Sequence, residues 1–158
     1  MQNTQFRFAT RQDTALILDF IKELALYENM LDAVVATNDL LEKQLFDEKR
    51  GEVIFAIENG KEVGFALFFH NFSTFLGRAG LYLEDLFVKP EFRKRGHGKA
   101  LLKELAKIAV SRGCGRLELS CLDWNTPSID FYLSLGAKKM DEWTIYRFSG
   151  ENLENLAK

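Results

Sequence analysis

The chain has 158 residues, of which 47% are hydrophobic and 28% are charged, and its formal net charge at pH 7 is −2. This length can enclose one hydrophobic core, so we expect a single domain over residues 1–158. The small net charge argues against broad attraction to nucleic acid or to an anionic membrane, and no apolar run reaches the ~18 residues of a spanning helix. Cys114 and Cys121 lack the spacing of a disulfide framework or a zinc site. The first residues lack a secretion signal, and we therefore expect a cytoplasmic protein.

In chain order, a short strand comes first. Phe6 and Phe8 alternate with polar residues over positions 5–9. A helix follows, with Thr10 or Asp13 as its cap, and it ends near Tyr27. A second helix is expected over residues 38–46, with Thr37 or Asn38 as its cap.

A β-hairpin is expected next, because Asn59-Gly60 separates two apolar segments and both residues tolerate the positive φ of a tight turn. Its strands are expected at residues 52–58 and 62–70, with a loop over 71–79.

The central part of the chain reads as an apolar strand that ends at Val88, a basic glycine-rich turn and an amphipathic helix that ends near Ser111. Gly113 supplies a left-handed stop for this helix. Later elements are a strand at 116–122, a helix with Thr126 as its cap and Pro127 at its first position that stops at Gly136, strands at 138–141 and 143–148, and a short helix or tail at 149–158.

The basic turn has the chemistry of a phosphate site. Arg93 to Gly98 follow an R-x-x-G-x-G pattern at the start of the helix. Glycine lets backbone N–H groups approach an anion, and the orphan donors and positive dipole end of a helix favour negative charge. A pyrophosphate is therefore the expected guest, although a tight connection with a solvated basic face would leave the same pattern.

The segment V-x-P-E-F-R-x-x-G-x-G-K-A-L-L, residues 88–102, resembles the acetyl-CoA motif of the GNAT N-acetyltransferase superfamily. Three further segments narrow the resemblance to the diamine (spermidine/spermine) acetyltransferase branch with its thialysine-acetylating relatives; they lie at residues 21–28, 81–85 and 123–132. The resemblance implies an α/β GNAT fold. In that fold a mixed, mostly antiparallel sheet of about seven strands is flanked by four helices, and it splays between strands four and five to admit acyl-CoA.

The resemblance also implies the residues that contact acetyl-CoA, with no metal. Backbone groups of one strand would contact the pantetheine arm, and the basic turn would hold the pyrophosphate through Arg93 and the Lys94–Lys99 loop. The side chains of His70 and His97 are expected to be bystanders, with only the backbone N–H of His97 in use. The implied cofactor-binding residues are Leu86, Phe87, Val88, Arg93, Lys94, Arg95, Gly96, His97, Gly98, Lys99, Asn125 and Ser128.

Acetyl transfer to an amine requires removal of a proton from the amine and delivery of one to the leaving thiolate. Glu84, at the position of the family's acidic residue, is our candidate for a general base that acts through water, and Asp85 is assigned to substrate attraction. A regular strand would direct these two side chains to opposite faces, so both serve one site only if the strand bulges. Structural carboxylates with backbone or arginine partners are the alternative.

Tyr132, seven residues after Asn125, lies at the position of the family's general acid. A phenol can protonate a leaving thiolate. Simple core packing is the alternative for Tyr132. Asn125 could equally be a plain helix cap.

The resemblance implies that an elongated cation, a diamine, polyamine or thialysine-like amine, is the acceptor. The implied substrate-binding residues are Tyr27, Glu28, Glu84, Asp85 and Glu118. For the carboxylates, the alternative is a solvated surface position. For the function, the alternatives are acetylation of a protein amine and a non-catalytic acyl-CoA-binding module. Relatives pair as homodimers, with the segment around Trp143 near the partner's site, which implies a homodimer here as well. A buried or pocket-lining Trp143 without a dimer is the alternative.

Overall fold

The structure is a computed structural model that describes residues 4–158. The chain divides into two compact units, residues 1–120 and residues 121–158. The expectation that residues 1–158 form a single domain stays a prediction.

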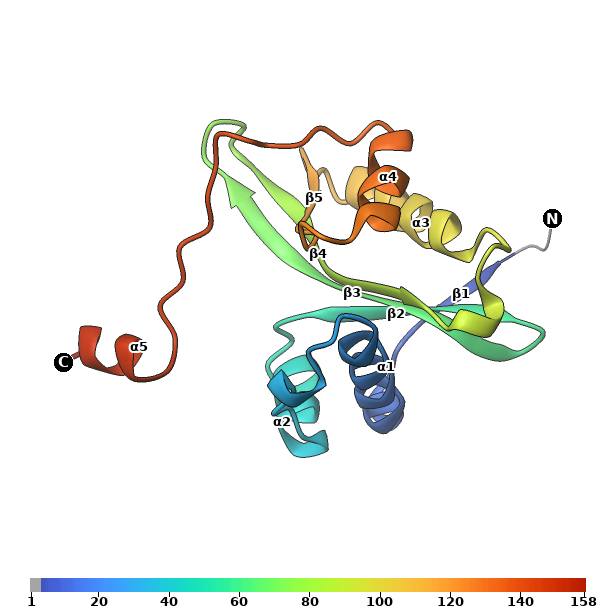
Figure 1. The fold of residues 1–158 in the computed structure, drawn as a ribbon, viewed down its shortest axis with the longest axis horizontal. Coiled ribbons are helices and arrows are strands. Elements are labelled where there is room, and N and C mark those ends of the chain that lie inside the picture. Colours follow the sequence, from blue (N-terminus) through green and yellow to red (C-terminus); the bar gives the residue numbers. More distant parts are fainter. Residues whose placement is uncertain (1–3) are drawn as a thin grey trace. The chain divides into compact units, whose positions relative to one another are not determined.

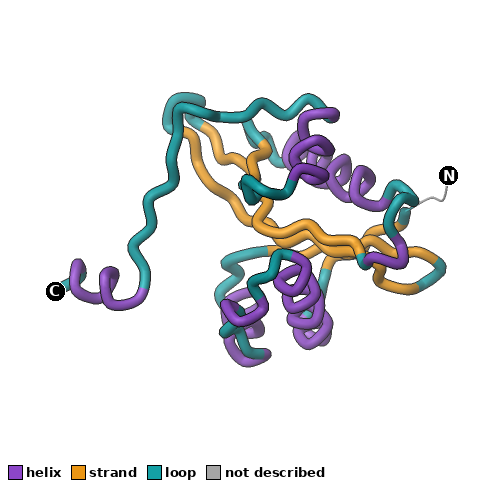
Figure 2. Tube along the Cα trace, viewed as in Figure 1, coloured by secondary structure: helices purple, strands orange, loops and turns teal. Residues whose placement is uncertain are grey.

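The first unit is built on one five-stranded sheet in the order β1-β2-β3-β4-β5 (Figures 1 and 2). Its first four strands pair antiparallel, and β4 pairs parallel with β5. This confirms the mixed, mostly antiparallel sheet. The strands are β1 Gln5–Phe8, β2 Glu52–Glu58, β3 Lys61–Ser73, β4 Arg78–Val88 and β5 Leu117–Leu119.

Helices cover both faces of this sheet. Figure 1 shows α1 and α2 on one face and α3 on the other. Phe20 of α1 packs with Phe55 and Phe65 of the sheet, whereas Leu101 of α3 packs with Leu81 in a second cluster. The helices are α1 Thr14–Tyr27, α2 Asn38–Glu42 with a π-helical continuation Lys43–Asp47, and α3 His97–Ser111, with short 3-10 turns at Arg11–Asp13, Leu31–Ala33 and Pro90–Phe92.

Several local expectations are confirmed. Asn59 and Gly60 have φ values of 50° and 78°, as the tight hairpin requires. Thr37 caps α2 by accepting a hydrogen bond from the Leu40 N–H. Gly113 has a φ of 73° just after α3.

Other boundaries differ from the expectation. The loop expected at 71–79 is a turn of four residues, 74–77, because cross-strand pairs continue to Ser73–Arg78. The strand expected at 116–122 is only Leu117–Leu119.

The parallel pairing of β4 with β5 covers only residues 81–83, whereas β4 continues to Val88. The end of β4 that carries the implied cofactor-binding residues therefore extends beyond this pairing.

The second unit contains two helices, α4 Thr126–Ser134 and α5 Gly150–Leu156, and α5 confirms the expected terminal helix. The strands expected at 138–141 and 143–148 are not formed; these residues are an exposed loop in Figure 2. A strand needs a neighbour to pair with, and residues 121–158 contain none. The expected counts of seven strands and four helices were therefore wrong, since residues 4–158 form five strands and five α-helices.

Among residues 4–158, no helix combines the length and apolar character needed to cross a bilayer.

Candidate active site

A β-bulge in β4 sets the direction of the two candidate carboxylates. Leu67 of β3 pairs with Asp85 and the next residue, Phe68, pairs with Leu83, so Glu84 is the extra residue. Leu83 packs on the α3 side, whereas Phe87 packs on the α1 side. In a regular strand these two odd-numbered residues would share a face, so the bulge turns Asp85 and Phe87 towards α1. The sequence required a bulge here if Glu84 and Asp85 were to serve one site, and the strand has that bulge.

Asp85 is half-buried on that face, while Glu84 is exposed. Burial, together with the nearby charges of Glu84 and Glu28, raises the pKa of Asp85 to about 7. Burial also raises the pKa of Glu28, which follows the last residue of α1. Three of the predicted substrate-binding carboxylates thus act on one another electrostatically.

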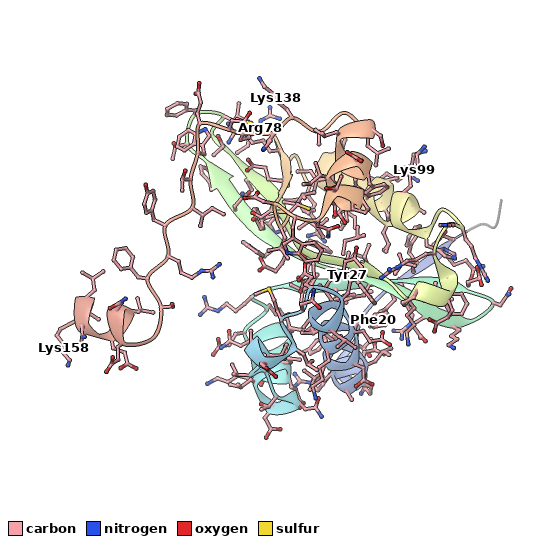
Figure 3. The ribbon with its side chains drawn as sticks, in the orientation of Figure 1. Phe20, Tyr27, Arg78, Lys99, Lys138 and Lys158 are labelled. Carbon is pink, nitrogen blue, oxygen red and sulfur yellow. The ribbon has the colours of Figure 1, made fainter. Side chains whose placement is uncertain are left out.

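An aromatic pair joins these carboxylates to the basic turn. The Tyr27 ring lies edge-on to the Phe87 ring, with centroids 6.4 Å apart, and Figure 3 shows Tyr27 at the end of α1. The Arg93 guanidinium lies 4.9 Å from the Tyr27 centroid and 5.1 Å from that of Phe87. Arg93 Nε also donates a hydrogen bond of 2.9 Å to the Val88 carbonyl. Arg93 therefore reaches back to the end of α1 in this structure, which brings Tyr27 and Glu28 close to the basic turn.

Glu118 lies on β5 opposite Tyr82 of β4. Its carboxylate accepts a hydrogen bond of 3.2 Å from the Asn71 side chain, and Tyr82 Oη lies 2.5 Å from Ser120 Oγ. Glu118 is thus part of a polar row next to the start of the bulged strand. No described contact joins Glu118 to Asp85.

The basic turn has the geometry of an anion cradle. Gly96 is left-handed with φ 87° and directly precedes α3, so the first N–H groups of a 15-residue helix face outward at this point. Lys94 is also left-handed, with φ 63°. Figure 3 shows Lys99 extending away from α3 into solvent. These residues fit a diphosphate, because the orphan N–H groups and positive dipole end of α3 lie in an exposed segment that also carries Lys94, Arg95 and Lys99.

Leu86 to Val88 of β4 are the residues implied to contact the pantetheine arm. They pair with β3 along one edge of β4, while the pairing of the other edge with β5 is limited to residues 81–83. Leu86 pairs with Ala66, and Val88 with Gly64. The side chains of Phe87 and Val88 belong to the core, as expected.

The second unit carries the remaining predicted residues. Asn125 is buried and caps α4, its Oδ1 accepting from the Ser128 N–H at 3.3 Å. The capping role is therefore confirmed, although Asn125 rather than Thr126 provides it. Tyr132 is half-buried in the middle of α4, with its ring centroid 5.1 Å from that of Phe131.

Sequence reasoning missed one buried residue beside the cradle. Glu58, at the end of β2, is 6% exposed and contacts both Arg95 and His97. His97 itself is 1% exposed, so its side chain is not the bystander expected. Strand periodicity could not have found Glu58, because residues 53–57 are apolar at both parities; the one signal is a glutamate at the end of a strand that is covered on both faces.

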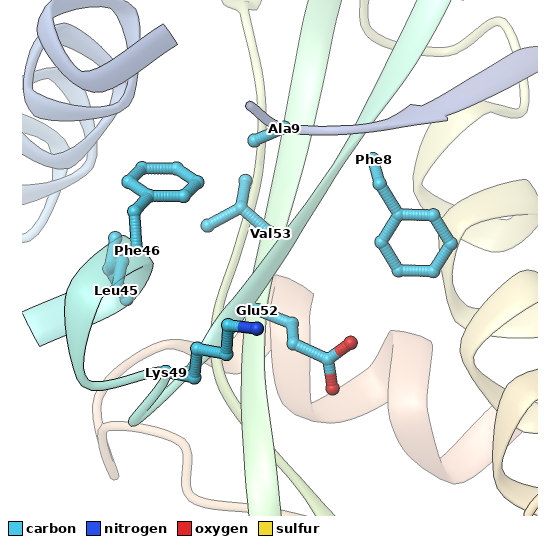
Figure 4. Close-up of a pocket in the computed structure, with 8 residues that line it drawn as sticks. Phe8, Ala9, Leu45, Phe46, Lys49, Glu52 and Val53 are labelled. Atoms are coloured by element: carbon cyan, nitrogen blue, oxygen red, sulfur yellow. The ribbon is translucent and has the colours of Figure 1, made fainter. Parts of the chain in front are cut away.

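A cavity of about 370 Å³ lies elsewhere in the first unit, between β1, the π-helical turn and β2 (Figure 4). Phe8, Phe46 and Lys49 are among its lining residues. None of the residues predicted for the site lines it. Among residues 4–158, no group of three or more His, Cys, Asp or Glu side chains is arranged to hold a metal ion.

Comparisons with known proteins agree with this geometry. The model of the Acetyltransferase (GNAT) family matches residues 20–137. The chain is 36% identical over 169 residues to a thialysine N-epsilon-acetyltransferase of Bos taurus, with 99% of each chain covered. It is 34% identical over 168 residues to the spermidine/spermine N(1)-acetyltransferase-like protein 1 of Homo sapiens, which covers 99% of this chain but 24% of the relative.

Among solved structures, an integron cassette protein from the mobile metagenome of V. cholerae superposes with a TM-score of 0.82 at 30% identity, covering 100% of this chain and 99% of that one. This sheet topology and the family match together define an acetyltransferase of the GNAT class. The chain belongs to the GNAT acetyltransferase family, as an N-acetyltransferase. Members of this family use acetyl-CoA as the acetyl donor.

Proposed function

We propose that this protein transfers an acetyl group from acetyl-CoA directly to a primary amine of a small cationic substrate, a diamine, polyamine or thialysine-like amine. The observation that carries the proposal is the grouping of Glu28 and Asp85 with the exposed Glu84 at the end of α1 and the β4 bulge. Carboxylates grouped in this way attract and align an elongated cation. Relatives with 99% coverage of this chain carry the names thialysine and spermidine/spermine acetyltransferase.

The basic turn supplies the donor site of the proposal. The backbone N–H groups at the start of α3, with Arg95 and Lys99, would hold the pyrophosphate of acetyl-CoA. Backbone groups of Leu86 to Val88 and the side chains of Asn125 and Ser128 would hold the pantetheine arm. When bound, acetyl-CoA supplies the activated acetyl thioester, and no covalent enzyme intermediate is needed.

Glu84 acts as the general base through water. A primary amine with a pKa near ~10.4 is almost fully protonated at neutral pH, and removing its proton at pH 7 costs about 4–5 kcal/mol. Glu84 is exposed to water and lies next to Asp85, whose raised pKa of about 7 lets it hold or release a proton near neutrality. The two neighbouring carboxyls can therefore accept the proton that the amine loses.

Tyr132 acts as the general acid that protonates the departing thiolate of CoA. A phenol can donate its proton to a leaving thiolate and be re-protonated afterwards.

The protein acts as a homodimer in the cytoplasm. Support for the dimer comes from the loop between α4 and α5, where large apolar side chains are exposed: Trp143 is 78%, Ile145 72% and Tyr146 87% exposed. Exposed apolar surface of this kind marks interaction sites. A monomer mass in light scattering would remove the dimer from the proposal.

An amine panel tests the acceptor class. CoA thiol release is measured with acetyl-CoA and each of spermidine, 1,3-diaminopropane, thialysine, lysine, ornithine and a lysine-containing peptide. We expect the highest kcat/KM for a diamine, polyamine or thialysine, and at least a tenfold loss for Asp85→Asn through a higher amine KM. Release with the peptide alone would replace this proposal with a protein acetyltransferase.

A further inference from the structure

Strand β2 carries a glutamate at each end, and both face helix α3. Ile54 and Ala56 pack with Leu101 of α3, and Glu52 and Glu58 share their even-numbered parity. Six residue steps of a strand span about 20 Å, and 15 residues of helix span about 22 Å. The two glutamates therefore lie at opposite ends of α3.

At the C-terminal end of α3 the contact is a solvent-exposed ion pair. Arg112 donates to Glu52 through two nitrogens, at 2.6 and 3.0 Å. The side chains of Arg112 and Glu52 are 33% and 38% exposed. This pair is remote from the basic turn and serves as an internal comparison.

At the N-terminal end the contact is buried and more elaborate. Glu58 Oε2 accepts from Arg95 Nη1 at 2.6 Å, and Glu58 Oε1 lies 2.9 Å from His97 Nε2. Because an ionised carboxylate only accepts hydrogen bonds, His97 Nε2 carries the hydrogen. His97 Nδ1 lies 2.9 Å from the Thr4 hydroxyl. Both imidazole nitrogens and both Glu58 oxygens thus have partners, as a buried carboxylate requires.

Arg95 extends from this buried network to the surface. Its guanidinium lies 5.2 Å from the centroid of the Phe92 ring, and its side chain is still 42% exposed. A guanidinium has five N–H donors in a planar fork, so a contact through one nitrogen leaves others to face an anion.

We propose that Glu58 is a positioning residue for coenzyme binding: together with His97 it holds Arg95 and the first turn of α3 in the geometry that receives the CoA pyrophosphate. This inference depends on the phosphate site of the proposed function. An arginine fixed before the ligand arrives loses less side-chain entropy on binding, whereas a released arginine must be ordered by the ligand itself.

The sign of the effect separates positioning from simple charge. A carboxylate near a diphosphate repels it, so removal of the Glu58 charge alone would tighten binding. If Glu58 acts by positioning, its removal weakens binding instead. The amide of a glutamine carries no charge and accepts through one atom only, so the ion pair with Arg95 is lost, and both contacts persist only if His97 moves its hydrogen to Nδ1 and accepts from the glutamine NH₂.

The test is isothermal titration of CoA into wild-type protein, Glu58→Gln and the matched control Glu52→Gln. We expect Glu58→Gln to raise the Kd for CoA about tenfold, and Glu52→Gln to change it less than twofold. In steady-state assays Glu58→Gln should raise the KM for acetyl-CoA and leave kcat within twofold. With acetylpantetheine, which lacks the pyrophosphate, kcat/KM should match that of wild type.

Equal or tighter CoA binding by Glu58→Gln, with wild-type binding intact, would overturn the positioning role and leave the proposed function standing. A wild-type protein that binds no CoA would instead overturn the proposed phosphate site, and this inference with it.

Arg95 variants keep the proposal testable if Glu58→Gln fails to fold, since Arg95 is partly exposed. Arg95→Lys retains the charge but loses the planar fork, and we expect it to weaken CoA binding nearly as much as Arg95→Met does. Wild-type affinity in Arg95→Lys would contradict the positioning role. In the double variant Glu58→Gln/Arg95→Met, provided that it folds, Glu58→Gln should raise the Kd for CoA less than twofold above that of Arg95→Met alone. If the two substitutions instead multiplied their separate effects on the Kd, the positioning role would be overturned.

Discussion

Asp85 gives the sharpest physical prediction, because the same carboxyl that is proposed to attract the substrate should lower the stability of the protein above neutral pH. The β4 bulge turns it towards α1, where burial and the charges of Glu84 and Glu28 raise its pKa from 3.8 to about 7. The perturbation is Asp85→Asn, which keeps the shape of the side chain and cannot ionise.

The direction follows from proton linkage. Folded protein binds the Asp85 proton more tightly than unfolded protein does, so this group contributes most to stability below pH 3.8. The contribution is lost as the pH rises through about 7. The difference between the two pKa values corresponds to about 4 kcal/mol at pH 8. This is an upper bound, because Asp85 is only half-buried and water screens its exposed edge.

The assay is urea unfolding of wild type and Asp85→Asn at several values from pH 4 to pH 8. We expect Asp85→Asn to gain about 2–4 kcal/mol over wild type between the ends of this range. Any constant cost of burying the amide cancels in this comparison. Asp19→Asn, an exposed position on α1, is the control and should leave the pH dependence unchanged.

The reasoning would be refuted by unfolding free energies of wild type and Asp85→Asn that run parallel within about 0.5 kcal/mol from pH 4 to pH 8. A stability that rose with pH only in wild type would also refute it, since that is the behaviour of a carboxyl with a lowered pKa.

Three further changes test the core, the cradle and the acid. Phe20→Ala should cost about 3–5 kcal/mol in urea unfolding, because Phe20 is 0% exposed and stacks on Phe65 at 5.1 Å, whereas Leu26→Ala, at a 64% exposed site, should cost under ~1 kcal/mol. Lys94→Gly should leave the free energy of unfolding within about 1 kcal/mol of wild type, since relief of the left-handed φ of 63° offsets the chain entropy of glycine. Its CoA affinity should fall about threefold because one positive charge is lost. A loss of stability above ~2 kcal/mol would contradict the strain argument. Tyr132→Phe should retain the wild-type Kd for CoA and lower kcat at least tenfold, and wild-type turnover would remove Tyr132 as the acid.

Local chemistry explains which elements could be predicted from the sequence. Asn59-Gly60, Thr37 and Gly113 each specify one backbone geometry, and the structure has that geometry at all three places. The apolar stripe of α3 and the R-x-x-G-x-G turn likewise predict a helix that starts near Gly98, and α3 starts one residue earlier, at His97. The strands expected at 138–141 and 143–148 failed for the opposite reason: alternation supplies a strand-like sequence but no partner strand.

The site required information that periodicity does not carry. Residues 81–88 are apolar at both parities, so nothing in the pattern reveals that the strand changes face at Glu84. The bulge determines which face Asp85 occupies. Without it, Asp85 would point with Leu83 into the apolar cluster beneath α3, which consists of hydrophobic side chains. Glu58 is a similar case, since β2 is apolar at both parities and the partners of Glu58 lie 37 and 39 residues away. A buried carboxylate can persist only with such partners, and an inward-facing glutamate at the end of an apolar strand is therefore itself a prediction that a cation and a donor will be found beside it.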